Sequence, residues 1–211
     1  MALILASASP RRREILRRAG WSFRSLAADL DERIRRGETA RHYVLRLAQA
    51  KAEAVVARRP ATRLPLLGAD TTVECGGRIL GKPASPRHAR HMLRALSGRR
   101  HRVWTGLALL DPRLRCGWRV AVVTAVWMRR LRPEDIAAYV AGGEPLDKAG
   151  AYAIQGGAAP FVVRIEGDYD NVVGLPRNAL RQLWRARAAF RSRPSQGMPK
   201  PIPGGWRWFQ L

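Results

Sequence analysis

The amino-acid sequence predicts an α/β fold, because short apolar runs with strand character alternate with amphipathic helical segments along the chain. The chain has 211 residues, of which 46% are apolar and 26% charged, so it is long enough to bury one substantial core. We expect one domain over residues 1–190. From Arg191 onward proline and glycine are dense, which predicts a flexible C-terminal tail over 191–211. The tail's aromatic residues are expected to dock either on a partner or on the body of the protein.

The first half of the domain begins with a strand and two helices. Residues 3–6 form a short apolar run, which predicts a buried strand. A helix is predicted to start at Pro10, with Ser9 as its N-cap and Gly20 closing it. A second helix is predicted over residues 39–58, and Lys51 falls on its apolar stripe.

A strand and a hairpin are predicted next. Residues 63–70 read as a short apolar strand that ends at Asp70, and residues 71–80 read as a hairpin around Gly76 and Gly77. Counting outward from that turn pairs Cys75 with Arg78, Val73 with Leu80, and Thr71 with Lys82. We therefore expect Lys82 to return beside Asp70.

The second half of the domain is predicted to be mixed. Helices are expected over residues 85–98, 133–140 and 176–190, and residues 103–111 and 119–128 alternate as two adjacent antiparallel strands. The segment 142–176 is rich in glycine and polar residues. An irregular polar stretch of this length in a compact domain predicts a functional loop.

The charge balance predicts an anionic partner. The chain has 39 Lys and Arg against 16 Asp and Glu, a net charge of +23, which suits nucleic acid, an anionic membrane or a phosphorylated ligand. Only four of the cations are lysines. Lys51, Lys82 and Lys148 fall at positions where a buried cation needs an anionic ligand, and together they favour a polyphosphate site, although each alone could be a surface residue.

Cysteine usage and the N-terminus predict a cytoplasmic protein. Cys75 and Cys116 are the two cysteines of the chain, too few for a disulfide framework or a zinc cluster. The N-terminal apolar run is too short to span a membrane, and its positive charges follow the run instead of preceding it, unlike a signal peptide. No membrane partner is expected.

Three arginines stand at the start of the first predicted helix, where the backbone is already positive. Each cation there is disfavoured by about 0.3 to 1 kcal/mol unless an anion binds. Arg12 precedes Ile15 by three residues and should point inward, while Ser7 and Ser9 offer hydroxyls. Amides, hydroxyls and guanidinium groups together predict a phosphate cradle; a solvated basic turn is the alternative.

Two isolated acids, Glu32 and Asp70, are candidates for holding a divalent cation. Mg²⁺ commonly takes one or two protein carboxylates and completes its shell with water and phosphate oxygens. The alternative for each acid is that it caps a turn or pairs with an arginine.

Five blocks of sequence together resemble the Maf family of nucleoside triphosphate pyrophosphatases: SASPRRREIL, ADTTVECGGRILGKP, LSGRRHRVWTGLALLD, GEPLDKAGAYAIQG and EGDYDNVVGLP. The resemblance is collinear from Leu3 to about Phe190. It implies an α/β fold like that of inosine triphosphatase, with a long twisted mixed sheet, flanking helices and a cleft between two lobes. It also implies hydrolysis of a nucleoside triphosphate to the monophosphate and pyrophosphate with a divalent metal, Mg²⁺ or Mn²⁺, as nucleotide-pool housecleaning.

The resemblance also implies the roles of individual residues. Asp70 matches the family's catalytic aspartate, and Glu32 matches the family's acidic residue on the metal side. Glu32 and Asp70 are therefore the expected metal ligands. The positions that bind phosphate match Ser7, Arg11, Arg12, Lys51 and Lys82. Arg11, Thr71 and Gln155 match the branch that acts on dTTP and UTP.

Alternatives to this function remain open at the level of sequence. A sister branch prefers a modified purine substrate, 7-methylguanosine triphosphate. A nucleic-acid-binding protein is the rival from another class, supported by the net charge and by Trp and Arg near the C-terminus. A homodimer is a further open expectation.

Overall fold

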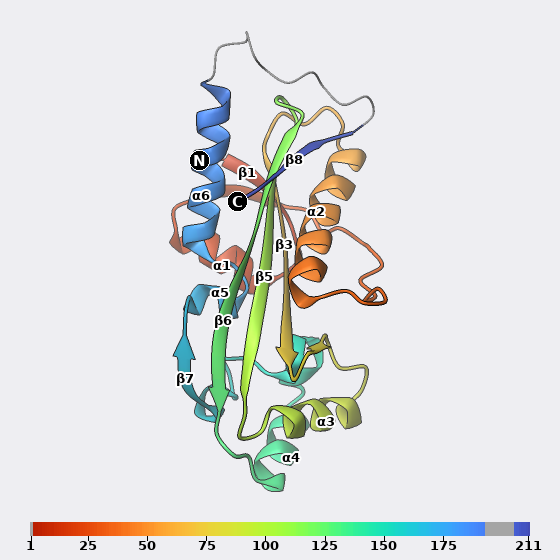
Figure 1. Cartoon of the computed structure of the whole chain (residues 1–211), viewed down its shortest axis with the longest axis vertical. Helices are drawn as coiled ribbons and strands as arrows, with labels where there is room; N and C mark the ends of the chain where they lie inside the picture. Colours follow the sequence, from red (N-terminus) through yellow and green to blue (C-terminus); the bar gives the residue numbers. More distant parts are fainter. Residues whose placement is uncertain (1, 193–204) are drawn as a thin grey trace.

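The structure is a computed structural model that describes residues 2–192 and 205–211. Its centre is a mixed eight-stranded sheet with the order β2-β1-β3-β5-β6-β7, in which β4 pairs with β3 and β8 pairs with β6 (Figure 1). The strands are β1 (Ala2–Ala6), β2 (Ser22–Ser25), β3 (Leu66–Cys75), β4 (Arg78–Leu80), β5 (Arg100–Asp111), β6 (Cys116–Met128), β7 (Val162–Glu166) and β8 (Arg207–Gln210). The predicted α/β class is confirmed.

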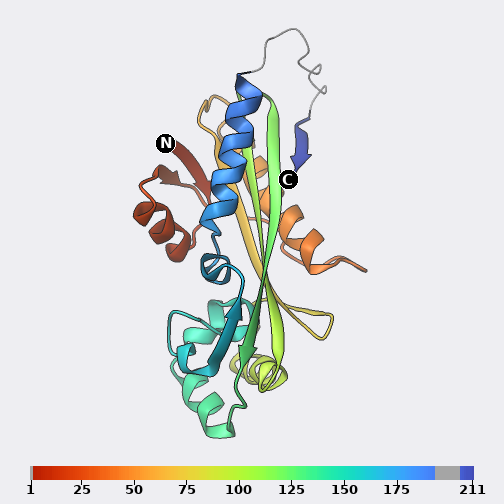
Figure 2. The same ribbon diagram turned by 60° about the vertical axis from the view of Figure 1, so that its left-hand side comes forward.

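Six α-helices flank the sheet in the described part of the chain. They are α1 (Pro10–Arg18), α2 (Ala40–Arg58), α3 (Pro86–Leu96), α4 (Pro133–Ala141), α5 (Tyr169–Val173) and α6 (Arg177–Arg191). Three short 3₁₀ helices, η1 (Glu144–Asp147), η2 (Ala149–Ala151) and η3 (Ala159–Phe161), lie between α4 and β7. The antiparallel strands β5 and β6 run along the length of the molecule, with α1, α2 and α6 around one half and α3, α4 and β7 around the other (Figure 1). In Figure 2, α2 and α6 lie on opposite faces of the sheet.

The helices α1, α2 and α3 begin within one residue of their predicted starts. Ser9, Thr39 and Ser85 are the N-caps of α1, α2 and α3, and each hydroxyl accepts a hydrogen bond from the backbone N–H three residues further on. Gly20, just after α1, has a φ of +73°, a conformation that glycine adopts without a steric penalty. Local sequence signals therefore determine these helix ends.

Helix α2 lies unusually close to the sheet because two glycines face it. A Cβ on Gly68 of β3 would stand 1.9 Å from the carbonyl oxygen of Ala48, and one on Gly106 of β5 would stand 2.3 Å from that of Val44. Only glycine leaves room for this approach. The contact brings Lys51, one turn after Ala48, against β3.

Strand β3 is longer than predicted: it does not end at Asp70 but continues to Cys75. Its second half pairs with β5, so that the backbone of Asp70 lies opposite Gly106 and that of Thr71 opposite Thr105. A partner strand distant in the sequence thus extends a strand that local polarity predicted to stop.

The hairpin that follows β3 is shorter than predicted. Cys75 pairs with Arg78 and Val73 with Leu80, as expected, and Gly76 and Gly77 both have positive φ. The further pair of Thr71 with Lys82 does not form, because β4 ends at Leu80, while β5 pairs with the opposite edge of β3. Lys82 therefore follows the strand as a loop residue.

The segment 142–176 is more ordered than the prediction of a polar loop implied. It contains η1 to η3, then β7, which pairs with β6, and the five-residue helix α5. These elements are short, and β7 exposes Val163, so neither periodicity nor a buried face marks β7 in the sequence.

The end of the chain forms strand β8, which runs parallel to β6. The indole N–H of Trp208 donates to Glu53 of α2 at 2.9 Å, and the ring of Phe209 stacks on Trp118 at a centroid distance of 5.8 Å. The prediction of a flexible tail is therefore wrong for residues 205–211, whose aromatic side chains dock on the body of the protein. Residues 193–204 of the predicted tail lie outside the described residues.

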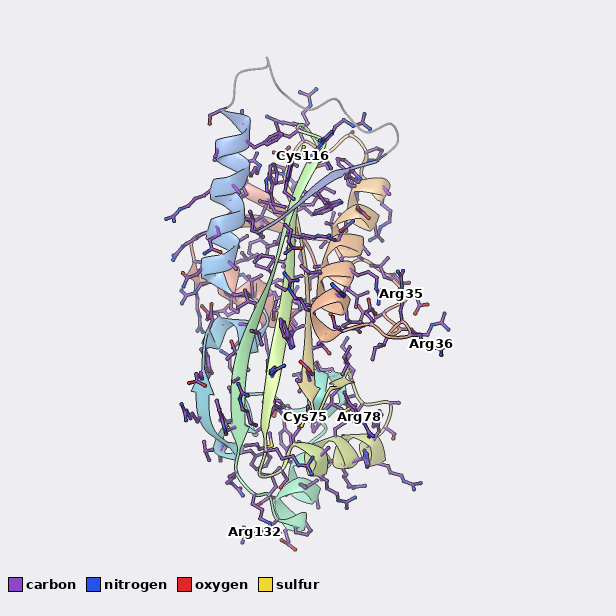
Figure 3. All side chains as sticks on the ribbon, in the orientation of Figure 1. Arg35, Arg36, Cys75, Arg78, Cys116 and Arg132 are labelled. Atoms are coloured by element: carbon purple, nitrogen blue, oxygen red, sulfur yellow. The ribbon has the colours of Figure 1, made fainter. Side chains whose placement is uncertain are left out.

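The two cysteines lie toward opposite ends of the sheet (Figure 3). Cys75 and Cys116 are both buried, and neither is in a disulfide. Among the residues that the structure describes, no helix is both long and apolar enough to cross a membrane.

Candidate active site

A cavity of about 500 Å³ lies where the two halves of the molecule meet. A volume of this size suits a small-molecule ligand. Its walls come from the start of α1, from α2 and β3, and from the loop containing η1 and η2. All nine site residues predicted from the sequence line it: Ser7, Arg11, Arg12, Glu32, Lys51, Asp70, Thr71, Lys82 and Gln155.

Lys51 joins the two acids of the site. Its Nζ lies 2.6 Å from Oδ1 of Asp70 and 2.7 Å from Oε1 of Glu32. Lys51 and Asp70 are 8% and 6% exposed, so their ion pair is almost fully removed from water. The close packing of α2 on β3 makes this possible, because it places the lysine of the helix directly against the aspartate of the strand.

The carboxyl group of Asp70 is only partly satisfied. Its Oδ2 is buried and has no hydrogen-bond partner among the described residues. Burial raises the pKa of Asp70, and the charges of Lys51 and Arg12 offset only part of this rise. The result is a buried carboxyl group with a free oxygen atom and a higher proton affinity than an ordinary aspartate.

Glu32 is half-buried and has the opposite electrostatic balance. Its partial burial is the largest influence and acts to raise its pKa, but the hydrogen bond and charge of Lys51, together with the charges of Lys82 and Arg12, lower the pKa by more, so the net pKa is lowered. The backbone carbonyl of Glu32 accepts a hydrogen bond from Oη of Tyr43 at 2.9 Å. This contact ties the loop before α2 to the helix.

Arg12 points inward, as predicted, and makes three hydrogen bonds. Its Nε donates to the carbonyl oxygen of Gly174 at 2.9 Å, one terminal nitrogen donates to Oγ of Ser7 at 3.0 Å, and the other donates to Oγ1 of Thr71 at 3.1 Å. Burial lowers the pKa of the guanidinium, and the nearby charges of Asp70 and Glu32 act against that change.

The cavity carries a net positive charge. Five cations and three carboxylates line it; the cations are Arg11, Arg12, Lys51, Lys82 and Lys148, and the carboxylates are Glu32, Asp70 and Asp147. Lys148 forms an ion pair with Asp147, whereas Lys82 is exposed. The excess cations can neutralise an anionic ligand.

Several residues that hold the site together were missed by sequence reasoning. Thr105 and Asn171 are fully buried and hydrogen-bonded behind Thr71, and Tyr152 lines the cavity while its Oη lies 2.8 Å from Nε2 of the buried His101. A polar residue within a buried strand is the one signal that marks Thr105. Asn171 lies in the segment expected to be a loop, where no periodicity distinguishes it.

The residues present fit a hard divalent cation in part. No group of three or more His, Cys, Asp or Glu side chains with metal-site geometry occurs in the described ranges. Glu32 and Asp70 nevertheless offer carboxylate oxygens bridged by a single lysine, and one oxygen of Asp70 is without a partner there. One or two carboxylates are the usual protein contribution to Mg²⁺ when phosphate oxygens and water complete the shell.

The family model for Maf-like proteins matches residues 2–187, so the chain belongs to the Maf family. This confirms the resemblance inferred from the five sequence blocks. The match stops before β8, which therefore lies beyond the family domain.

Curated relatives are similar over most of their length. A dTTP/UTP pyrophosphatase of Geotalea uraniireducens is 53% identical over 174 residues, which cover 82% of this chain and 89% of the relative. The dTTP/UTP pyrophosphatases of Salmonella typhimurium and Escherichia coli O157:H7 are each 51% identical, covering 82% and 83% of this chain and 87% of each relative.

Solved structures are similar at a much lower level. The Ham1 protein of Staphylococcus aureus has a TM-score of 0.42 and 13% identity, covering 61% of this chain and 72% of its own. A dITP/XTP pyrophosphatase of Mycobacterium abscessus has a TM-score of 0.41 and 17% identity, covering 92% and 100%. The family assignment rests on the sequence matches and not on these values.

Proposed function

We propose that this chain hydrolyses nucleoside triphosphates, with dTTP and UTP preferred, to the nucleoside monophosphate and pyrophosphate. The observation that carries the proposal is Asp70, a buried carboxyl group with an unpartnered oxygen in the wall of a net-positive cavity. The curated relatives at about 50% identity, named dTTP/UTP pyrophosphatases, support the substrate.

Asp70 is proposed to activate the attacking water. A general base must accept a proton at the operating pH, and burial raises the pKa of this carboxyl toward that range. The water gives its proton to Asp70 while its oxygen forms a bond to the α-phosphorus. The bond from the α-phosphorus to the bridging oxygen breaks, and pyrophosphate leaves with that electron pair.

Cations around the cavity are proposed to bind the triphosphate. Arg12 presents a guanidinium that its hydrogen bonds hold in place, and Ser7 lies beside it. Lys51 brings a buried positive charge, while Arg11 and the exposed Lys82 extend the positive lining. Phosphoryl transfer depends mainly on such positioning and charge neutralisation.

Glu32 and Asp70 are proposed to hold a divalent cation, Mg²⁺ or Mn²⁺. When bound, the cation supplies further neutralisation of charge on the phosphate oxygens. The half-exposed carboxylate of Glu32 would contact the cation directly, and Asp70 would hold it through a water molecule, which leaves Oδ2 of Asp70 available as the base.

Selection of the base is proposed to involve Arg11, Thr71 and Gln155, which all line the cavity. The amide of Gln155 can donate and accept a hydrogen bond at once, as the edge of a pyrimidine requires. Hydrolysis of a modified purine triphosphate is the runner-up. The net charge of +23 keeps nucleic-acid binding as a second candidate function.

The cell compartment and the assembly are part of the same proposal. Both cysteines are buried and free of disulfides, which supports a reducing cytoplasmic setting. A homodimer is the assembly to be tested, by light scattering of the purified chain.

A nucleotide panel with Mg²⁺ or Mn²⁺ tests the activity by following pyrophosphate and orthophosphate separately. We expect pyrophosphate from dTTP and UTP, at least a hundredfold less from the Asp70→Asn variant, and an unchanged rate from Asp29→Asn, which alters an exposed carboxyl group. Release of orthophosphate, or an Asp70→Asn variant that folds and turns over like the parent, would overturn the proposal.

A further inference from the structure

We infer that Thr105 and Asn171 are positioning residues that hold the guanidinium of Arg12 in its phosphate-binding orientation, although neither lines the cavity. The inference rests on the proposed function of Arg12 as a phosphate ligand. Thr105 and Asn171 are both fully buried, and they lie 66 residues apart in the sequence. Together with Gly174 they connect the start of α1 to the turn formed by α5.

The α5 turn contacts Arg12 directly through one backbone atom. The carbonyl oxygen of Gly174, the C-cap of α5, accepts the hydrogen bond from Nε of Arg12. Gly174 has a φ of +116°, and a Cβ there would lie 3.3 Å from Oγ1 of Thr71 and 3.6 Å from Nε of Arg12. Glycine therefore lets the turn approach the guanidinium closely.

The same turn contacts Arg12 a second time through two hydroxyl groups. A terminal nitrogen of Arg12 donates to Oγ1 of Thr71, which lies 2.9 Å from Oγ1 of Thr105. Thr105 in turn donates its hydrogen to the carbonyl oxygen of Asn171 at 2.9 Å.

This last bond sets the direction of the whole chain of hydrogen bonds. A hydroxyl has a single hydrogen, so Thr105 must accept from Thr71, and Thr71 must accept from Arg12. The hydroxyl hydrogen of Thr71 is therefore used in the bond to Thr105, so Thr71 can only accept a hydrogen bond from a ligand and cannot donate one. This series of hydrogen bonds, from the guanidinium of Arg12 through Thr71 and Thr105 to the backbone carbonyl of Asn171, is called the relay below.

Asn171 is itself fixed to the sheet. Its Nδ2 donates to the carbonyl oxygen of Val103 on β5 at 2.9 Å and to Oγ1 of Thr124 on β6 at 3.0 Å. These two bonds leave the α5 turn little freedom to move relative to the strands. The carbonyl oxygen at the end of the relay is therefore a rigid acceptor.

The relay has a consequence for ligand binding. A guanidinium has five N–H groups, and three of those of Arg12 are used by Gly174, Ser7 and Thr71. One N–H on each terminal nitrogen is left, and these two groups are available to donate to a phosphate group. Because the guanidinium is already held in place before the ligand arrives, less conformational entropy is lost when the ligand binds.

The test compares Thr105→Val, which keeps the shape but removes the hydroxyl, with Thr105→Ser, which keeps the hydroxyl. We expect Thr105→Val to raise KM for dTTP and the Kd for pyrophosphate about three- to tenfold, with kcat changed less, and Thr105→Ser to restore both. Thr124→Val, which loosens Asn171 without touching Thr105, should shift KM in the same direction.

A double-mutant cycle with Arg12→Lys separates positioning from general loss of structure. If Thr105 acts through Arg12, Thr105→Val should have no further effect on KM when the guanidinium is already absent. Equal effects of Thr105→Val in both backgrounds, or no effect in either, would overturn the inference. Thr72→Val, which removes a buried hydroxyl without a described partner, calibrates the unfolding free energy of such a substitution.

Failure of the inference can be distinguished from failure of the proposed function. Wild-type protein that releases no pyrophosphate from any nucleotide would contradict the function. A strong effect of Arg12→Lys together with wild-type KM in Thr105→Val and Thr124→Val would contradict the positioning role and leave the function intact.

Discussion

The ammonium group of Lys51 lies 2.6 Å from Oδ1 of Asp70, and both residues are more than nine-tenths buried. Taking two charges out of water is unfavourable unless each neutralises the other. The pair is therefore a place where stability and activity depend on the same contact. It also explains why a chain with only four lysines has one in the apolar stripe of α2.

Replacing Lys51 with methionine should destabilise the protein by about 3 to 5 kcal/mol near pH 7, because a buried carboxylate is left uncompensated. Urea unfolding measures this change. Asp70 would avoid part of this penalty by binding a proton, so the loss of unfolding free energy should be smaller at acidic pH. Pyrophosphatase activity should be abolished, because a protonated Asp70 cannot act as the base. Lys82→Met is the matched control: Lys82 is exposed, so its unfolding free energy should stay within about 0.5 kcal/mol of the parent.

The pH dependence of activity should report the raised pKa of Asp70. The base must be ionised, so kcat/KM should fall as the pH drops through this pKa, at a pH above the ordinary aspartate value of about 3.9. Arg12 lowers the pKa of Asp70 by its charge, so Arg12→Gln should move this acidic limb to higher pH. If the acidic limb of the kcat/KM profile lies at the same pH in Arg12→Gln as in the parent, the group that titrates is not Asp70.

The unfolding free energy should decrease as the pH is lowered from about 6.5 to about 4, because of His101. Burial lowers the pKa of this imidazole to about 4, whereas the unfolded chain binds the proton near pH 6.5. The unfolded state therefore holds one more proton in this window, and folding loses about 3 kcal/mol across it. Urea titrations at several pH values should show this slope in the parent and in His91→Gln, which alters an exposed histidine, and not in His101→Gln.

Gly68→Ala should displace α2 and disturb the site from a distance. The added Cβ would lie 1.9 Å from the carbonyl oxygen of Ala48, a backbone atom that cannot move without the helix. We expect a loss of more than about 3 kcal/mol in unfolding free energy and a marked fall in activity, because Lys51 follows on the same helix. Gly81→Ala, where a Cβ meets nothing within 4 Å, is the matched substitution for the unfolding measurement.

The C-terminal strand should contribute stability more than catalysis. Trp208 rests on Gly117 of β6, where an added Cβ would lie 2.4 Å from the indole ring. Trp208→Ala and Gly117→Ala should each lower the unfolding free energy by about 2 kcal/mol, and the double variant should lose little more than either. Additive losses would mean that the two residues do not act through the same contact. Activity of the folded single variants should remain near that of the parent.

Local signals in the sequence determined most of the elements and the membership of the site. The capping Ser9 placed the start of α1, the Ser85-Pro86 pair placed the start of α3, and the two glycines after Cys75 placed the hairpin turn, because such features depend only on neighbouring backbone groups. The family resemblance named nine residues, and all nine line one cavity.

Other features were decided only by the tertiary structure. The continuation of β3 past Asp70 depends on pairing with β5, and strand β8 depends on an exposed edge of β6 and on Gly117. The ion pair of Lys51 with Asp70 requires α2 to approach the sheet at Gly68. The sequence determined which groups could carry the chemistry, whereas packing between distant segments decided which of them are buried and which atoms they bind.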